Sequence, residues 1–270
     1  MARIRLLALD IDGTLLAPDG TIPEANKEAL RRAVGRGLVV SLSSGRMTDC
    51  IQPFYDQLGI DGPVMAYNGA MVRKSREEGR GIVFHQPLPL SVAREVLEFA
   101  LKNHYLLNYY VNDVLYCQDD PSLQYYAQIY SDQTGAVYHP TDLRRLADRE
   151  PSKLIIITDP PERDRLYDWW LARIQGKATL VKTNPEYLEF MAPGVDKGRG
   201  LEALAGALGF DLGEVAAVGD GLNDLPMIKK AGLGVAVANA KQEVKEAADL
   251  VLREKAEEGA VAQVVSYLGF

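Results

Sequence analysis

The feature that most constrains this chain is an apolar run near the N-terminus that ends abruptly in carboxylates. Residues 5–16 read RLLALDIDGTLL, so a short apolar segment leads directly into Asp10, Asp12 and Gly13. An apolar run closed by turn residues predicts a strand buried on both faces of a parallel sheet. Ligands of such sheets bind at the carboxyl ends of the strands. Asp10 and Asp12 are therefore candidate functional residues, although an Asp- and Gly-rich turn alone would be compatible with a structural role.

Composition and charge narrow the class of protein. The 270 residues are 47% hydrophobic and 25% charged, as expected for a globular protein with one large domain or two moderate ones. The net charge is −7 and the basic residues are scattered, so we expect no nucleic-acid partner. No apolar run is long enough for a membrane span or a signal-peptide core. Cys50 and Cys117 are far apart and outside any metal-ligand spacing, so neither a disulfide framework nor a zinc site is supported, and the cytoplasm is the expected location.

The remaining apolar segments predict an α/β fold, a doubly wound parallel sheet, with a second domain inserted into it. Strands alternate with helices in both terminal parts of the chain. Between them, residues 84–190 change to an α+β pattern rich in tyrosine. We therefore expect a discontinuous core domain of residues 1–83 and 191–270, interrupted by a domain of residues 84–190. The further core strands are expected at residues 38–42, 64–67, 215–218, 234–237 and 250–252.

Polar residues follow three of the predicted core strands. Ser43 and Ser44 follow residues 38–42, and Asp220, Asn223 and Asp224 follow residues 215–218. The ends of parallel strands meet at one edge of the sheet, so these side chains should converge with Asp10 and Asp12. Carboxylates without histidine or cysteine form an all-oxygen site that suits Mg²⁺.

A lysine is predicted at the start of a helix near this edge. Asp196 is a candidate N-cap, which makes Lys197 the first helical residue. A cation is unfavourable at a helix N-terminus because of the helix dipole. Its presence there favours a functional role, such as neutralising phosphate oxygens beside a metal.

The chain resembles the haloacid dehalogenase superfamily of phosphatases, in the Cof-type branch (IIB) that carries a C2B cap. Four motifs carry the resemblance, in order and over essentially the whole length. They are residues 10–14 (DIDGT), 44–46 (SGR), Lys197-Gly198 and residues 219–224 (GDGLND). The resemblance implies a Rossmann-like core and an inserted α+β cap that determines substrate specificity.

The resemblance also implies roles for these residues. Asp10 would form an aspartyl-phosphate, and Asp12 would act as the general acid and base. The Asp10 carboxylate, the Asp12 backbone carbonyl and Asp220 would bind Mg²⁺, with Asp224 orienting the site. The family usually has Thr where Ser44 stands, so Ser43 remains an alternative hydroxyl. The phosphate contacts are expected to be Ser44, Lys197, Asn223 and Gly13, with Gly45 and Arg46 as further candidates unless Arg46 only flanks a helix.

The implied function is a Mg²⁺-dependent phosphatase that hydrolyses small phosphorylated metabolites, with sugar phosphates as the expected class. One alternative is a specialised phosphatase of the sucrose-phosphate, mannosyl-3-phosphoglycerate or phosphoglycolate type. A phosphomutase is another. From other classes of function, a phospho-acceptor signalling domain would be about half this length, and a sugar-phosphate binding protein would not need the complete motif set. We expect a monomer or a small homo-oligomer.

Overall fold

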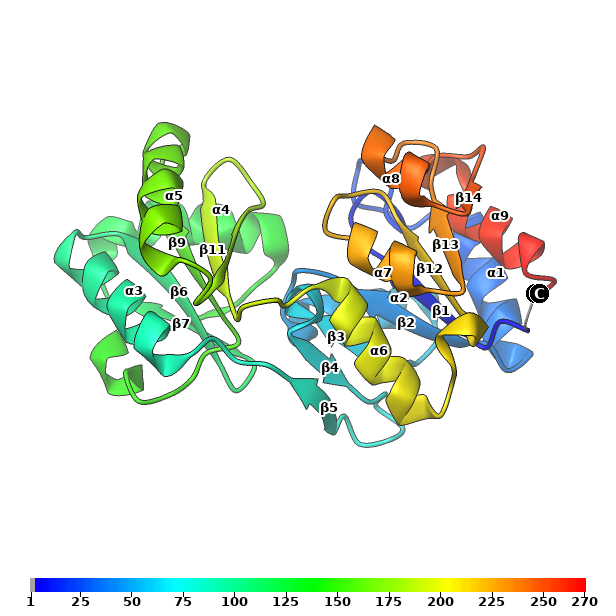
Figure 1. The fold of residues 1–270 in the computed structure, drawn as a ribbon, viewed down its shortest axis with the longest axis horizontal. Coiled ribbons are helices and arrows are strands. Elements are labelled where there is room, and N and C mark those ends of the chain that lie inside the picture. The colour runs from blue at the N-terminus through cyan, green and yellow to red at the C-terminus, as the bar shows by residue number, and fades with distance from the viewer. Residues whose placement is uncertain (1–2) are drawn as a thin grey trace. The chain divides into compact units, whose positions relative to one another are not determined.

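The computed structural model describes residues 3–270, and the chain forms two compact units (Figure 1). Unit 1 combines the N-terminal part through His85 with Asp196–Phe270, and unit 2 is Gln86–Val195. The sequence-based boundaries, after residues 83 and 190, lie slightly earlier. The first shift arises because the strand β5 (Ile82–His85) pairs with β4 and therefore stays with unit 1.

Unit 1 is built on an eight-stranded sheet in the order β14-β13-β12-β1-β2-β3-β4-β5. The strands from β14 to β3 are parallel, whereas β4 and β5 are antiparallel to their neighbours. The apolar runs enter the sheet because a strand with helices on both faces can bury every side chain, as β1 does. The bounds are β1 Leu6–Asp10, β2 Val39–Ser43, β3 Val64–Ala66, β4 Met71–Arg73, β12 Val215–Gly219, β13 Leu233–Ala236 and β14 Leu250–Val251.

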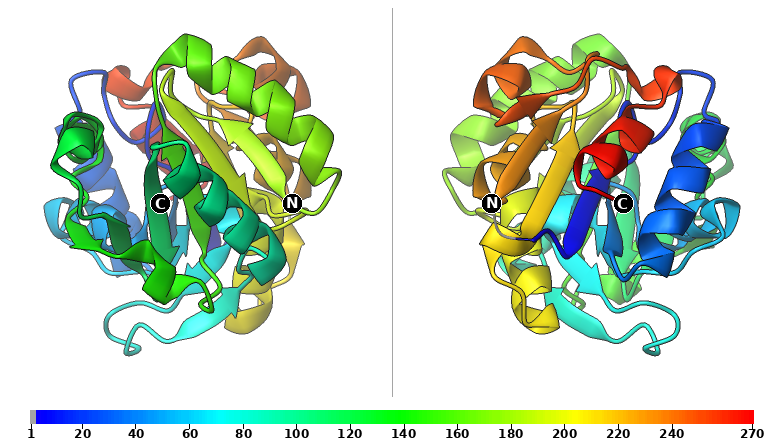
Figure 2. Two further views of the ribbon diagram at one scale, coloured as in Figure 1. Left: turned by 90° about the vertical axis from the view of Figure 1, so that its left-hand side faces the viewer. Right: turned by 90° about the vertical axis from the view of Figure 1, so that its right-hand side faces the viewer.

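Helices cover both faces of this sheet. One face carries α1, which packs against α9 and α2, and the other carries α6, which packs against α7 (Figures 1 and 2). The prediction of a doubly wound α/β core is therefore confirmed. A buried apolar cluster under α6 includes Leu6, Ala8 and Leu201. The bounds are α1 Glu24–Gly35, α2 Thr48–Leu58, α6 Lys197–Leu208, α7 Leu225–Lys230, α8 Gln242–Ala247 and α9 Ala260–Tyr267, with 3₁₀ turns η1 Tyr67–Gly69, η4 Leu212–Glu214 and η5 Ala256–Glu258.

Unit 2 has a six-stranded sheet in the order β10-β11-β9-β6-β7-β8, antiparallel except for the pair β7 and β8. Its apolar core gathers around Trp170 and Phe190. The strands are β6 Leu106–Val111, β7 Val114–Gln118, β8 Tyr138–Thr141, β9 Lys153–Ile157, β10 Thr179–Lys182 and β11 Tyr187–Met191. The helices are α3 Leu90–Lys102, α4 Gln124–Thr134 and α5 Pro160–Ile174, with 3₁₀ turns η2 Pro121–Leu123 and η3 Leu143–Leu146.

Three short elements were not expected from the sequence. The edge strand β8 contains Pro140, which disfavours strands, and α8 is only six residues long. The third is β5. Asp120 caps η2 by accepting a hydrogen bond from the Ser122 amide, and α4 begins directly after this 3₁₀ turn. Within residues 3–270, no helix combines the length and the apolar character needed to cross a bilayer.

Candidate active site

The candidate site lies in unit 1, at the carboxyl ends of three neighbouring strands. Asp10 is the last residue of β1 and stands beside Ser43, the last residue of β2. On the other side of β1 lies β12, which ends at Gly219 and leads into the loop of Asp220 and Asp224. Parallel pairing places these ends together. Residues separated by about 200 positions therefore meet at one edge of the sheet. For example, the Thr14 hydroxyl donates a 3.1 Å hydrogen bond to Asp220 Oδ1.

Lys197 lies at the centre of this edge. It is fully buried, and its Nζ is 2.5 Å from Asp10 Oδ1, 2.5 Å from Asp224 Oδ1 and 3.3 Å from the Ser43 carbonyl oxygen. Three acceptors match the three protons of an ammonium group. Burial alone would lower the pKa of Lys197, but the carboxylates of Asp10 and Asp224 raise it above the ordinary lysine value. The lysine is therefore charged, and these carboxylates offset its unfavourable position at the helix N-terminus.

Three carboxylates lie near the single ammonium group of Lys197. One oxygen atom from each of Asp10, Asp220 and Asp224 lies within 4.8 Å of the others. Burial, followed by repulsion from Asp224, raises the pKa of Asp10 well above its ordinary value despite Lys197. Burial and Asp224 also raise the pKa of Asp220. A crowded all-oxygen donor set with an excess of negative charge fits a hard divalent cation such as Mg²⁺.

Asp224 uses both of its oxygens within the protein. Oδ1 accepts from Lys197, while Oδ2 accepts from the backbone amides of Asp220 at 3.0 Å and Gly221 at 2.9 Å. At Gly219 a Cβ would lie 2.4 Å from the Asp224 Cβ, so only glycine fits there. Asp224 therefore shapes the loop that carries Asp220 and links it to Lys197.

The turn after β1 approaches Asp220 closely. Gly13 has φ +83°, and a Cβ there would lie 2.5 Å from Asp220 Oδ2. Its carbonyl oxygen accepts a 2.7 Å hydrogen bond from Asn239, whose Oδ1 in turn accepts from the Ala256 amide. Thr14 and Asn239 were not among the expected site residues. The Thr14 hydroxyl within DIDGT was an available signal, whereas nothing in the sequence around Asn239 indicates its contact with the turn.

Asp12 is paired with Arg46. Arg46 Nη2 is 2.8 Å from Asp12 Oδ1, and Nε is 3.1 Å from Oδ2, a bidentate arrangement. The Asp12 side chain is 57% exposed, so solvent screening weakens this ion pair. Arg46 thus contacts a site residue and does more than flank α2.

The two serines after β2 have different surroundings. The Ser44 hydroxyl accepts a 3.2 Å hydrogen bond from the Arg46 amide. The Ser43 hydroxyl is buried and has no hydrogen-bond partner among residues 3–270. The Ser44 hydroxyl is therefore bound to the backbone of the turn that leads to Arg46, whereas the Ser43 hydroxyl is not.

Asn223 is exposed on the loop before α7, and its Nδ2 lies 3.4 Å from Oδ1 of the buried Asn68. Asn68 was not among the expected site residues, and it lies in the turn between the antiparallel strands β3 and β4. The available signal was a polar, turn-forming residue directly after a buried strand.

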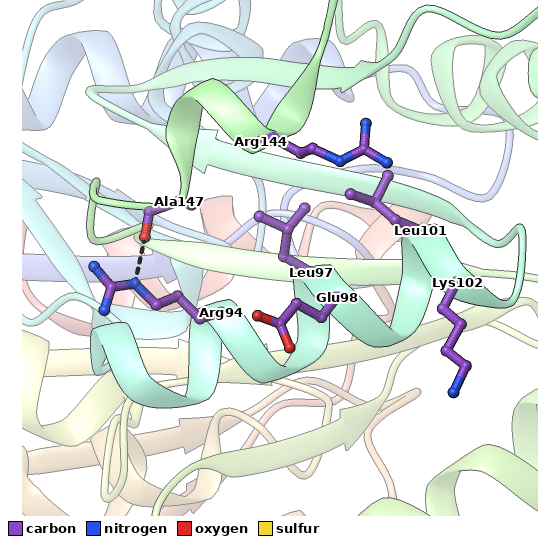
Figure 3. A pocket seen from close by; sticks show the side chains of 7 residues that line it. All are labelled: Arg94, Leu97, Glu98, Leu101, Lys102, Arg144 and Ala147. Carbon is purple, nitrogen blue, oxygen red and sulfur yellow. Dashed lines mark hydrogen bonds between the residues drawn. The ribbon is translucent and has the colours of Figure 1, made fainter.

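A cavity of about 590 Å³ in unit 2 has a different character (Figure 3). It lies between α3 and the segment that contains η3, and Arg94 Nε donates to the Ala147 carbonyl oxygen at 2.9 Å. The cavity is lined by three apolar side chains, three basic side chains and one carboxylate. Its size is that of a ligand pocket, but it lacks the cluster of carboxylates found at the sheet edge. The lining residues are Arg94, Leu97, Glu98, Leu101, Lys102, Arg144 and Ala147.

Comparison with known proteins agrees with this geometry. The sequence profile of the haloacid dehalogenase-like hydrolases matches residues 7–265. The HMP-PP phosphatase of Cronobacter sakazakii is 30% identical over 238 residues, covering 87% of this chain and 85% of the relative. The phosphatase YwpJ of Bacillus subtilis is 28% identical over 288 residues, covering 98% of this chain and all of the relative.

A solved structure has the same fold over nearly the whole length. A haloacid dehalogenase-like hydrolase from Bacteroides thetaiotaomicron superposes with a TM-score of 0.89 and 31% identity, covering 98% of this chain and 99% of the other. Profile, relatives and solved structure agree on the family. The chain belongs to the haloacid dehalogenase-like hydrolases and is a phosphatase of that superfamily.

Proposed function

We propose that this protein is a Mg²⁺-dependent phosphatase of small phosphorylated metabolites, with sugar phosphates as the substrate class, and that it works through an aspartyl-phosphate on Asp10. The observation that supports this most directly is the buried Lys197, held between Asp10 and Asp224 at 2.5 Å from each. An ammonium group fixed beside a nucleophilic carboxylate can orient it and stabilise charge on a transferring phosphoryl group.

Mg²⁺ would be held by the Asp10 carboxylate, the Asp12 backbone carbonyl and Asp220, with Asp224 orienting them. The close approach of the Asp10, Asp220 and Asp224 oxygens supports this assignment. When bound, the ion would neutralise charge on the phosphoryl oxygens. The Thr14 hydroxyl, 3.1 Å from Asp220 Oδ1, would keep that carboxylate in position.

The phosphoryl group would be bound by Lys197, the Ser44 hydroxyl, Asn223 and the Gly13 amide. Gly13 suits this role because its positive φ of +83° turns the chain tightly beside Asp220. Backbone and side-chain donors on separate loops can surround three equatorial oxygens, which gives orientation as well as charge stabilisation.

In the first half-reaction an Asp10 oxygen attacks phosphorus, and the bond from phosphorus to the ester oxygen breaks. Asp12, in its protonated form, donates a proton to that leaving oxygen. In the second half-reaction Asp12 takes a proton from water as the water attacks the same phosphorus. Inorganic phosphate leaves and the Asp10 carboxylate is restored. Asp12 must release Arg46, which now lies 2.8 Å away, to reach the leaving oxygen.

Unit 2 is proposed to act as the cap that determines substrate choice. A phosphomutase remains the second candidate, since it would use the same aspartyl-phosphate and differ only in returning the phosphoryl group to a sugar. Measuring phosphate release against sugar-phosphate isomerisation separates the two.

The test is phosphate release from a panel of phosphorylated metabolites by the wild-type chain and by Asp10→Asn. We expect release that EDTA abolishes and Mg²⁺ restores, and a loss of at least about 10⁴-fold in kcat for Asp10→Asn, because an amide cannot form the acyl phosphate. Calorimetry that detects substrate binding by the Asp10→Asn variant is the control that this variant is folded. Undiminished release by Asp10→Asn would contradict the proposed mechanism.

A further inference from the structure

The 3₁₀ turn η1 joins β3 to β4 in unit 1 and contains Asn68, a residue without a role in the reaction proposed above. We propose that Asn68 is a positioning residue of the phosphoryl site: its buried carboxamide, which lies against Gly45, holds the exposed carboxamide of Asn223 in place. This inference rests on the proposed function, in which Asn223 contacts the phosphoryl group.

The backbone of this turn is unusual. Tyr67, Asn68 and Gly69 follow one another with φ values of 52°, 53° and 90°. Positive φ is unfavourable for residues other than glycine, and least expected for a bulky side chain such as Tyr67, which is fully buried. Strain of this kind persists only where the surrounding structure enforces it, and it gathers at functional sites.

Hydrogen bonds on one side of the turn fix it to the loop after β2. The Tyr67 amide donates to the Arg46 carbonyl oxygen at 3.0 Å, and the Asn68 amide donates to the Ser44 carbonyl oxygen at 2.9 Å. The backbone of Asn68 is therefore attached directly to the proposed phosphate contact at Ser44.

The other side of the turn is pressed against the start of α6. A Cβ on Gly69 would lie 2.3 Å from the Asp196 carbonyl oxygen and 3.1 Å from the Lys197 Cα. Only a glycine permits this approach. The turn thus touches both the Ser44 loop and the segment that carries Lys197, so its conformation is linked to the position of both.

The side chain of Asn68 then reaches the third phosphate-binding segment. It is only 5% exposed, and a Cβ on Gly45 would lie 3.1 Å from its Nδ2, so the carboxamide lies directly against the glycine backbone. Its Oδ1 accepts from Asn223 Nδ2 at 3.4 Å. The amide nitrogen of Asn223 carries two protons, so one directed at Asn68 leaves the other for a phosphoryl oxygen.

This arrangement reduces the entropic cost of binding. An exposed asparagine must lose side-chain freedom when it contacts a ligand. Because Asn68 is buried and held by its backbone, it can restrict Asn223 before the substrate arrives. Pre-organisation of donors is a large source of transition-state stabilisation.

The test measures p-nitrophenyl phosphate hydrolysis by Asn68→Gly in the wild-type and Asn223→Ala backgrounds. Glycine tolerates positive φ, so this change removes the carboxamide and keeps the turn. We expect kcat/KM to fall about tenfold in the wild-type background and less than about twofold when Asn223 is already alanine, because a positioning residue acts through its partner. Equal losses in both backgrounds, or no loss in either, would overturn the proposal.

Asn112→Gly is the matched control, because Asn112 also has positive φ, 54°, but lies in the turn between β6 and β7 of unit 2. It should leave kcat/KM unchanged in both backgrounds. Asn68→Ala adds backbone strain to the loss of the amide, so its Tm should fall below that of Asn68→Gly while its coupling to Asn223 stays the same. Activity that follows Tm and not the coupling would also overturn the proposal.

The proposed function can fail separately. Hydrolysis by the wild-type chain and by Asn112→Gly that is lost in Asp10→Asn supports the phosphatase reaction, whatever Asn68→Gly does. A wild-type chain that releases no phosphate from any compound of the panel overturns the proposed function and, with it, the role of Asn68.

Discussion

Each unit of this protein buries one lysine against carboxylates, and the two lysines differ in how well their charge is balanced. In unit 2, Lys153 is 2% exposed and its Nζ lies 3.1 Å from Glu189 Oε2, with the Glu189 Oε1 accepting from Thr183 at 2.7 Å. In unit 1, Lys197 is bound by Asp10 and Asp224, and Asp220 lies close by. The first is a pair of opposite charges, whereas the second leaves negative charge in excess.

The difference is the one expected between a structural ion pair and the functional one proposed for unit 1. A balanced buried pair is complete in itself, although its desolvation cost makes it a modest contributor to stability. A buried cluster with surplus carboxylate is unfavourable until a cation or a proton joins it, as the raised pKa values of Asp10 and Asp220 indicate. Burial of a lysine therefore does not by itself indicate an active site, whereas a surplus of buried carboxylates around the lysine is a feature that favours one.

The sharpest test of this comparison removes each lysine in turn. Lys197→Met should lower kcat by about 10³-fold, because the phosphoryl group loses a fixed positive charge. Lys153→Met should change kcat by less than about threefold. Both changes should lower the free energy of unfolding by at least about 3 kcal/mol, because Lys153→Met leaves one buried carboxylate without its partner and Lys197→Met leaves two. Steady-state kinetics and urea unfolding give the two quantities.

A second variant controls for the structural part of that prediction. Lys153→Met/Glu189→Leu removes both charges from unit 2 and should regain most of the lost stability. Retention of full activity by Lys197→Met would break the comparison, because the two buried lysines would then be equivalent.

Replacing one glycine of positive φ in each unit should have a smaller effect than replacing the lysines. Gly13 has φ +83° and lies against Asp220, while Gly135 has φ +70° and nothing within 4 Å of the position of its Cβ. Both Gly→Ala changes should lower stability by about 1 kcal/mol through backbone strain. Gly13→Ala should also reduce kcat/KM at least tenfold and increase the Mg²⁺ concentration required, by displacing Asp220. Equal kcat/KM values for the two variants would show that the close contact between Gly13 and Asp220 is not needed for activity.

The smallest expected effect concerns Cys117 on β7 of unit 2. Burial raises the pKa of its thiol from 9.0 to about 11. Between these values the folded state keeps a proton that the unfolded state loses, so stability falls as pH rises through this window. At pH 10 the wild-type chain should have lost about 1 kcal/mol more than Cys117→Ala, measured from unfolding curves at pH 8 and pH 10.

Thiol labelling tests the burial of Cys117 in a second way. Cys117 is 4% exposed, whereas Cys50 on α2 of unit 1 is half-buried. Iodoacetamide at pH 8 should therefore modify Cys50 first, because alkylation requires an accessible thiolate. Faster labelling of Cys117 would contradict the burial of this face of the unit 2 sheet.

Much of the fold was predictable because its signals are local. The buried run before Asp10 and the apolar segment 215–218 both form strands of the parallel sheet, and Asp196 caps α6 by accepting from the Arg199 amide, as expected. The elements that were missed have weak local signals. β8 contains a proline and lies at a sheet edge, and α8 is too short for a clear helical period.

The amino-acid sequence by itself determined which residues could perform the chemistry, because apolar runs that end in carboxylates, hydroxyls and glycines carry that information in a few consecutive positions. The tertiary structure alone decided which of them touch: Lys197 with Asp10 across 187 positions, Arg46 with Asp12, and Asn68 with Asn223. These contacts depend on the order of strands in the sheet and on the path of each loop. Neither the strand order nor the loop path can be predicted from the sequence spacing of the residues that come into contact.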